Sequence, residues 1–186
     1  MDTNKVTVST GSLLVAEPFL GDGNFDRSVV LICEYSPAGT FGLIMNQVTD
    51  LQLSDVLEDV YADLPLFVGG PVQQNTLHFI HRRPDLIEGS IQVDQGLYWS
   101  GDFEQVKQAV NLGTLTEQDI RFFLGYSGWD GGQLTSEISH KSWIVTRADA
   151  EFLFETPAPD FWRDVLKRMG GMYRTIAHYP ADPSLN

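Results

Sequence analysis

The sequence predicts an α+β fold in one domain, with a mixed and largely antiparallel sheet flanked by helices. Three observations support this prediction. Short apolar, β-branched runs bounded by turn residues are typical of strands. Three longer stretches place apolar residues at helical spacing. The two kinds of segment alternate irregularly, without the repeated strand–helix–strand units of a parallel sheet.

Most of the first half of the chain is predicted to be extended. SVVLICEY at 28–35 and TFGLIM at 40–45 are separated by the turn SPAG, so we expect a hairpin. Because both runs are almost wholly apolar, we expect both faces of this hairpin to be covered. The predicted strands are residues 12–16, 28–35, 40–45, 66–68, 76–81, 90–93, 97–100, 119–126 and 141–147.

Helices are predicted in four places. Over residues 53–60 the apolar side chains recur at i, i+3, i+4 and i+7, which is one face of a helix. A second helix is expected to begin after Asp102 and to end at Gly113. The clearest pattern begins at Asp160, the expected N-cap, and continues to residue 169. Residues 132–138 are expected to form a short helix.

The charge balance argues against direct binding of nucleic acid. The chain has 12 Lys and Arg against 25 Asp and Glu, a formal net charge of −13. A protein that binds a duplex needs cations to displace the counterions of the phosphates. The nearest approaches to basic clusters are Arg82-Arg83 and Lys167-Arg168, and neither forms a stripe. Basic or metal-bridged partners remain compatible with this charge.

The single cysteine, Cys33, excludes an intramolecular disulfide. It lies in an apolar run beside Glu34, so we expect a buried, unreactive thiol. The N-terminus does not resemble a signal peptide. No run approaches the ~20 apolar residues of a membrane span. We therefore expect a cytoplasmic protein, with residues 1–186 as one domain, residues 1–10 and 180–186 as loose tails, and no membrane contact.

The stretch GYSGWDGGQL at 125–134 carries the strongest hint of a site, with three interpretations. It resembles a nucleophile elbow around Ser127, although Trp129 stands where that motif has glycine. Its glycines suit an anion cradle, but Asp130 would repel an anion, and neither nucleotide-binding glycine motif is present. The simplest interpretation is a tight corner whose glycines allow positive φ and whose tryptophan packs over the turn.

A second glycine-rich segment and a pair of histidines are further candidates for a site. In FVGGPV at 67–72, Gly-Gly-Pro fixes a bend after a strand and leaves room for a notch, with Asn46-Gln47 as hydrogen-bond donors. His78 and His81 are three residues apart, so on a strand they would point to opposite faces and would not share a metal. We predict no metal and no cofactor.

These segments carry a family resemblance. GSLLVAEP near the start, GLIMN at 42–46, FVGGPV at 67–72, GYSGWDGGQLTSE at 125–137 and SWIVT at 142–146 together resemble the AlgH/YqgE family of bacterial proteins. The order and spacing match over roughly residues 11–174. The resemblance implies a single α+β domain with a bifurcated, mixed sheet. Family members are often labelled transcriptional regulators, from a link to alginate production in one branch, but the family has no established biochemical function and no accepted catalytic residues.

The sequence therefore supports a candidate binding surface rather than a known site. We expect it to form where the two glycine-rich segments meet, with Trp129 as an apolar platform and Gln133 and Glu137 as polar contacts. Its residues are Asn46, Gly69, Gly70, Pro71, Ser127, Gly128, Trp129, Gly132, Gln133 and Glu137.

Three functions follow from this surface. The first is a non-catalytic binding or regulatory module that acts through a protein partner or a small ligand. The second is a hydrolase that uses Ser127 or the carboxylate pair of Asp130 and Glu137. The third is a structural component of an oligomer. The sequence leaves the oligomeric state open.

Overall fold

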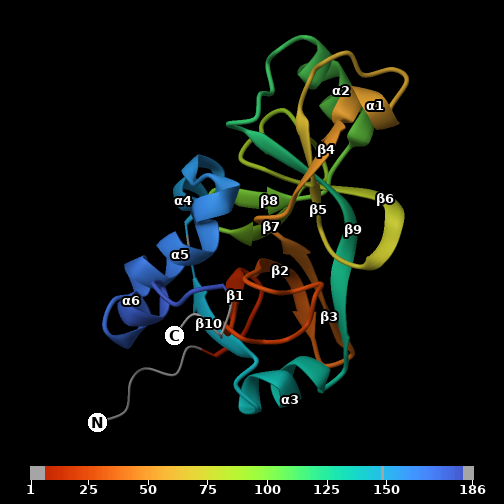
Figure 1. Ribbon diagram of the computed structural model, residues 1–186. Helices are drawn as coiled ribbons and strands as arrows, with labels where there is room; N and C mark the ends of the chain where they lie inside the picture. The colour runs from red at the N-terminus through yellow and green to blue at the C-terminus, as the bar shows by residue number, and fades with distance from the viewer. Residues whose placement is uncertain (1–6, 148, 182–186) are drawn as a thin grey trace.

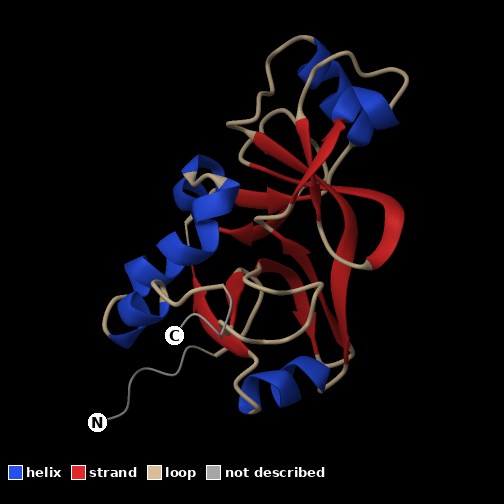
Figure 2. Ribbon diagram, in the orientation of Figure 1, coloured by secondary structure: helices blue, strands red, loops and turns tan. Residues whose placement is uncertain are grey.

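The structure is a computed structural model that describes residues 7–147 and 149–181. Within these residues ten strands form one connected sheet, and six helices lie around it (Figures 1 and 2). The predicted α+β class and the mixed sheet are confirmed.

The strands follow the predicted apolar runs closely. They are β1 Ser12–Ala16, β2 Val29–Ser36, β3 Gly39–Ile44, β4 Val48–Gln52, β5 Pro65–Val68, β6 Val72–His81, β7 Ile91–Asp94, β8 Leu97–Trp99, β9 Ile120–Asp130 and β10 Trp143–Arg147. The helices are α1 Leu53–Val56, α2 Phe103–Asn111, α3 Gln133–Ser139, α4 Ala150–Glu155, α5 Ala158–Met169 and α6 Met172–Ile176. Among the described residues, no helix is long and apolar enough to span a bilayer.

The sheet divides at β9. One edge of this long strand pairs with β6. Its other edge is shared: residues 122–124 pair in parallel with β5, and residues 127–130 pair antiparallel with β3. The main strand order is β10-β1-β2-β3-β9-β6-β8-β7, and the β4–β5 pair branches from β9. The bifurcation expected from the family resemblance is therefore present, and β5–β9 is the parallel pair that makes the sheet mixed.

The helices cover different parts of this divided sheet. α5 lies beside β1 and α4 beside β8, and Phe161 and Leu166 of α5 are fully buried in the apolar cluster that they share with the sheet (Figure 1). α1 and α2 lie at the opposite end of the molecule and close a separate apolar cluster around Phe122. α3 packs at the far end of β9, where Trp129, Leu134 and Trp143 form a third cluster.

Several elements differ from the predictions. β4, α4 and α6 were not predicted, and β9 continues four residues beyond the expected end to Asp130. α1 is a single turn, because Leu57 is extended while the apolar residues beyond it still pack into the core. α5 begins at Ala158 with Pro157 as its N-cap, which places Asp160 in the first turn rather than at the cap.

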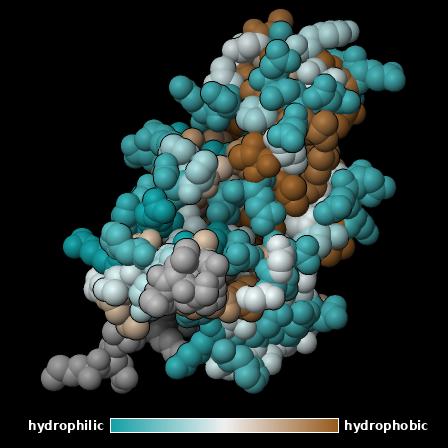
Figure 3. Space-filling view, in the orientation of Figure 1, coloured by the Kyte–Doolittle hydropathy of each residue, from teal (hydrophilic) through white to brown (hydrophobic). Residues whose placement is uncertain are grey.

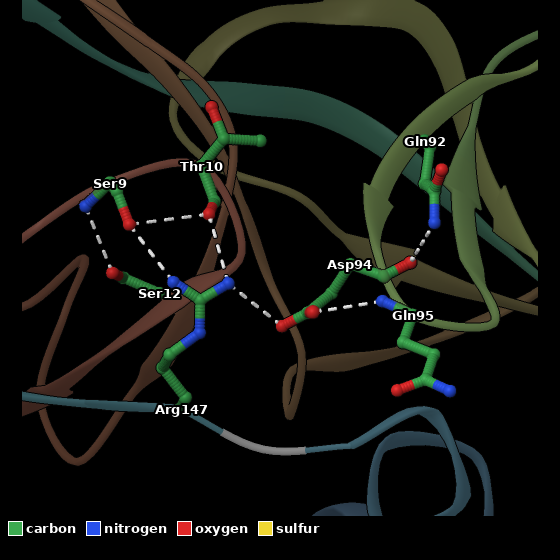
Figure 4. A network of polar contacts seen from close by, with 7 residues as sticks. All are labelled: Ser9, Thr10, Ser12, Gln92, Asp94, Gln95 and Arg147. Carbon is green, nitrogen blue, oxygen red and sulfur yellow. Dashed lines mark hydrogen bonds and ion pairs between the residues drawn. The ribbon is translucent and has the colours of Figure 1, made fainter.

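Arg147 ties three separate segments together (Figure 4). From β10 its guanidinium donates to the Ser9 hydroxyl at 2.9 Å and to the Thr10 carbonyl at 3.3 Å, and it pairs with Asp94 of β7 at 2.9 Å. At the other terminus, the Pro180 carbonyl accepts a hydrogen bond from Arg27. Among the residues expected to form loose tails, Ser9, Thr10 and Pro180 thus make defined contacts, and residues 1–6 and 182–186 lie outside the described part.

Candidate functional site

The structure brings the two glycine-rich segments together. The Gly69 amide donates to the Leu124 carbonyl at 2.8 Å, and the Gly69 carbonyl accepts from the Ser127 hydroxyl at 3.0 Å and from the Ile44 amide at 2.9 Å. This contact of residues 69–70 with residues 124–127, which we call the glycine junction, lies where β3 and β5 diverge from β9. The glycines therefore allow β3 and β5 to diverge from β9, at the point that we call the fork of the sheet.

The glycine junction is filled and offers no notch for a ligand. A Cβ atom placed on Gly69 would lie 2.2 Å from the Gly125 carbonyl oxygen, and one on Gly70 would lie 2.2 Å from the Tyr126 carbonyl. Such separations are far below van der Waals contact, so only glycine allows the two backbones to approach. Pro71 follows as an exposed residue.

Ser127 does not have the geometry of a nucleophile. Its side chain is 0% exposed, and its hydroxyl is committed to the Gly69 carbonyl. A catalytic serine needs a base within hydrogen-bond reach and a free approach for substrate. Among the described residues, the hydrogen bond to Gly69 is the one that this hydroxyl donates. The elbow interpretation of GYSGW is thus not supported, and the segment is the β9 strand itself.

Trp129, expected as an apolar platform of the binding surface, is a core residue with 6% of its surface exposed, as in the tight-corner interpretation of this segment. Its indole Nε1 donates to Glu137 at 2.9 Å, and the same carboxylate oxygen accepts from Trp143 Nε1 at 2.8 Å. Gln133 donates to the other Glu137 oxygen at 3.0 Å and accepts from the Asp130 amide. Glu137 is therefore a structural acceptor that joins α3 to β9 and β10.

Asn46 and Gly132 of the predicted surface also have structural roles. Asn46 bridges backbone, accepting from the Val29 amide and donating to the Arg27 carbonyl. Gly132 has φ of 81° and forms the N-terminal boundary of α3. Neither residue presents a free polar group of the kind expected for ligand contact. The expected acid pair is also lost, because Asp130 is exposed whereas both oxygens of Glu137 are occupied.

Gly128 is exposed, as are Pro71, Gly132 and Gln133 of the predicted surface. Gly128 faces Phe41 across the β3–β9 pair, and the Tyr126 ring lies close to it. Phe41 and Tyr126 stack with ring centroids 4.7 Å apart, and Trp99 and His78 extend this group of rings. Of these four rings, Phe41 and Tyr126 line a shallow groove of about 480 Å³, here called the aromatic groove. The simplest role of the Phe41 and Tyr126 rings is to cover the backbone at Gly128.

The histidines and the cysteine make no metal site. His81 is fully buried, with Nε2 3.0 Å from the Ser100 carbonyl oxygen and Nδ1 accepting from the Arg83 amide. Burial lowers the pKa of His78 and of His81, and it raises the pKa of the buried Cys33 thiol. Within residues 7–147 and 149–181, no group of three or more His, Cys, Asp or Glu side chains could hold a metal ion.

An apolar patch lies over the branch of the sheet. Val48 and Leu51 of β4 and Val56 of α1 are 52%, 41% and 40% exposed. Figure 3 shows apolar residues gathered over the region where Figure 1 draws β4, β5 and β9. Such a patch is compatible with the third function considered above, a structural component of an oligomer.

A deeper pocket lies where the sequence gave no site prediction. It has a volume of about 530 Å³ and lies between the start of β9, the β4–β5 branch and the link from α4 to α5. We call it the arginine pocket. Its lining includes Phe67, Arg82, Glu117, Arg121, Phe154, Glu155, Thr156 and Ala158.

Arg121 is the central polar residue of the arginine pocket. Its Nη1 is shielded from solvent and has no hydrogen-bond partner within the described residues. Burial lowers its pKa to about 10, partly opposed by the attraction of Glu117. The sequence feature that could have pointed to this pocket is the charged Arg121 within the apolar strand IRFFLGY. A buried arginine is unfavourable unless a partner compensates its charge, so its presence there suggests a ligand.

Sequence comparison places the chain among a defined set of proteins. A profile described as AlgH-like matches residues 13–174. A UPF0301 protein of Cytophaga hutchinsonii is 42% identical over 181 residues, covering 96% of this chain and 100% of the relative. A UPF0301 protein of Bacteroides thetaiotaomicron is 36% identical, covering 100% of this chain and 95% of the relative.

Solved structures show the same fold. A crystal structure of a Corynebacterium diphtheriae protein aligns with a TM-score of 0.79 at 25% identity, covering 95% of each chain. The solution structure of the AlgH protein from Pseudomonas aeruginosa aligns with a TM-score of 0.75 at 26% identity, covering 97% of this chain and 98% of that one.

Proposed function

The chain belongs to the AlgH-like family, and from this premise we propose that it is a non-catalytic binding or regulatory module that takes up a small molecule in the arginine pocket. This is the function expected from the sequence, but the proposed binding site is the arginine pocket rather than the glycine junction. A protein partner would then respond to the loaded state. The proposal also keeps a cytoplasmic location.

The observation that carries the proposal is the convergence of distant segments on one pocket. Pro65 and Phe67 come from β5, Arg121 from β9, Thr156 from the link between α4 and α5, and Ala158 from the first turn of α5. Pockets that bind small molecules commonly have volumes of about 300–1,000 Å³, with apolar walls and a few polar groups. The arginine pocket, at about 530 Å³, has this size and this mixture.

The geometry gives less support to a hydrolase. Ser127 is buried against the Gly69 carbonyl, and Glu137 is held by Trp129 and Trp143. Neither candidate offers a reactive group to a bound substrate without breaking these contacts.

Screening small molecules by thermal shift tests the proposed site. Thr156→Trp should fill the arginine pocket, and Thr135→Trp on exposed α3 is the matched control. We expect compounds that raise the Tm of the wild type and of Thr135→Trp by several degrees at saturation. The same compounds should leave the Tm of Thr156→Trp unchanged. A library without binders, or binders indifferent to Thr156→Trp, would contradict the proposal.

Any regulatory effect is proposed to be indirect, without contact to nucleic acid. The formal net charge of −13 supports this view, because so acidic a protein is repelled by phosphates. Filter binding of a random duplex at low salt should show no complex below about 10 µM protein. Sub-micromolar binding would refute this part of the proposal.

A further inference from the structure

We propose that the arginine pocket receives a monocarboxylate carried on a planar, apolar body, with Arg121 as the principal carboxylate-binding residue and Arg82 as the second. This inference rests on the proposed binding function and specifies the chemical class of the ligand.

The guanidinium of Arg121 has unused hydrogen-bonding capacity. Among the described residues it forms neither a hydrogen bond nor an ion pair within 4 Å, although Nη1 is buried. Its Nε and Nη2 are not shielded in this way, so one edge of the planar group remains accessible. A carboxylate on that edge accepts two parallel hydrogen bonds and neutralises the delocalised charge.

Two phenylalanine rings hold Arg121 without using its N–H groups. Its Cζ lies 4.6 Å from the centroid of Phe67 and 5.7 Å from that of Phe154. Cation–π contacts of this kind orient a guanidinium through its face and leave its edge free. The same rings give the pocket apolar surface suited to a flat ligand.

Arg82 adds a second cation to the same pocket. It follows β6 directly, and its Cζ lies 5.7 Å from the Phe154 centroid. No ion pair among the described residues includes it. The first turn of α5 also lies at the pocket, but it contributes little to anion binding. Pro159 has no N–H group, and the Asp160 amide donates to the Pro157 carbonyl at 3.1 Å.

Glu117 and Glu155 limit the charge of the ligand. Both line the pocket and both are exposed, whereas Arg121 is largely buried. A buried cation attracts an anion more strongly than exposed carboxylates repel it, since water screens the exposed charges. A second negative charge on the ligand would nevertheless meet both carboxylates. A carboxylate with one charge therefore fits better than a phosphate monoester with two.

The test uses four probes with one aromatic body. 2-Naphthoate, 2-naphthamide, 2-naphthylmethylamine and 2-naphthyl phosphate differ mainly in the charge of the head group. By calorimetry we expect 2-naphthoate to bind at least about tenfold more tightly than each of the others. A phosphate probe that binds more tightly would overturn the carboxylate assignment. Equal affinity for the acid and the amide would overturn any charge-based selection, while leaving the binding function intact.

Variants separate recognition from folding. Arg121→Met keeps an apolar side chain of similar length, and removing an uncompensated buried charge should leave the Tm equal or higher. The same change should weaken naphthoate at least about tenfold and leave naphthamide unaffected. Arg82→Gln should weaken naphthoate severalfold. Arg163→Gln, which removes the same charge from an exposed position outside the arginine pocket, is the control and should change neither affinity.

A fall in the Tm of Arg121→Met, with naphthoate still bound, would make Arg121 a structural residue and end the inference. If no probe of any charge binds the wild type, the binding function itself fails. The two failures are therefore distinguishable.

Discussion

Gly69 shows how tightly single residues are constrained at the fork of the sheet. A methyl group there would lie 2.2 Å from the Gly125 oxygen and 2.9 Å from Leu43 Cδ2. Because the first contact is with backbone, relief requires the strands to separate. We expect Gly69→Ala to lower the free energy of unfolding by at least about 3 kcal/mol, measured with urea. Gly23→Ala, which has open space around it, should stay within about 0.5 kcal/mol of wild type.

Trp129 provides a second test, because the sequence allowed either an apolar binding platform or a ring packed over the corner, and the structure shows a buried ring. We expect Trp129→Ala to lower the free energy of unfolding by about 3–5 kcal/mol, as for other core aromatics. Trp129→Phe should lose about 1–2 kcal/mol, since Glu137 then lacks one donor. Tyr61→Ala, at a side chain that is 79% exposed, is the control. Wild-type stability for Trp129→Ala would restore the platform interpretation.

At single residues, the sequence predicted burial correctly for an apolar position but not for the polar and aromatic residues of the candidate surface. Cys33 was expected to be buried, and it is. Ser127, Trp129 and Glu137 were assigned to a surface because their types suit binding, yet each satisfies an internal hydrogen bond. Ser127 and its partner Gly69 are 58 residues apart, so local pattern does not reveal their contact. Glu137 is only eight residues from Trp129 and six from Trp143, but the three come together through the packing of α3 on β9 and β10. Arg121 was not predicted as a site residue, because it lies in an apolar run that was interpreted only as a buried strand.

At the scale of elements, β6 carries a pH-sensitive contact. His81 donates through one ring nitrogen and accepts the Arg83 amide through the other, an arrangement that requires the neutral ring. Burial lowers the pKa of His78 and His81, with the Ser100 carbonyl and Asp85 partly opposing this at His81. Below about pH 6.5 the unfolded chain therefore binds more protons than the folded one.

Stability should consequently be level above pH 6.5 and fall as the pH drops below it, by up to about 1.4 kcal/mol per pH unit for each histidine that stays neutral in the folded state. Urea titrations between pH 8 and pH 5 measure this slope. In His81→Gln the slope should be smaller, whatever the absolute stability of the variant. An unchanged slope would show that His81 does not contribute to it.

Arg147 joins the N-terminal segment, β10 and the β7–β8 hairpin, which are distant in sequence. Since its side chain is 43% exposed, the stabilisation is modest, and Arg147→Gln should lose about 1 kcal/mol. Hydrogen exchange should quicken at residues 9–16 and 91–99. Lys167→Gln, in an exposed pair within one helix, should alter neither region. Uniform exchange rates across the Arg147→Gln variant would argue against a local tie.

Elements with strong apolar runs or clear helical spacing were predictable, as β2, β3 and α2 illustrate. β4 was missed because three of its five residues are polar and its partner β5 comes much later. α1 was predicted too long because Leu57 is extended and Val60, which follows a turn at residues 58–59, still reaches the core. The meeting of β5 with β9 depends on tertiary packing, and only the family resemblance anticipated the fork.

At the scale of the whole molecule, acidity should oppose compactness. With a formal net charge of −13, surface carboxylates repel one another, and salt screens this repulsion. Raising NaCl from about 10 to 150 mM should therefore raise the Tm by about 2–4 °C. Calorimetric scans at fixed pH provide the measurement. A lower Tm at 150 mM would mean that ion pairs such as Lys107–Asp59 outweigh the repulsion.

Because β9 belongs to both halves of the sheet, the chain cannot be divided within this strand into two independently folding fragments. Residues 120–126 complete one half of the sheet with β5 and β6, and residues 127–130 complete the other with β3. A cut anywhere along this strand would leave each fragment with an unsatisfied edge prone to self-association. Truncated versions are thus expected to precipitate, and co-expressed pieces to reassemble only when β9 stays whole.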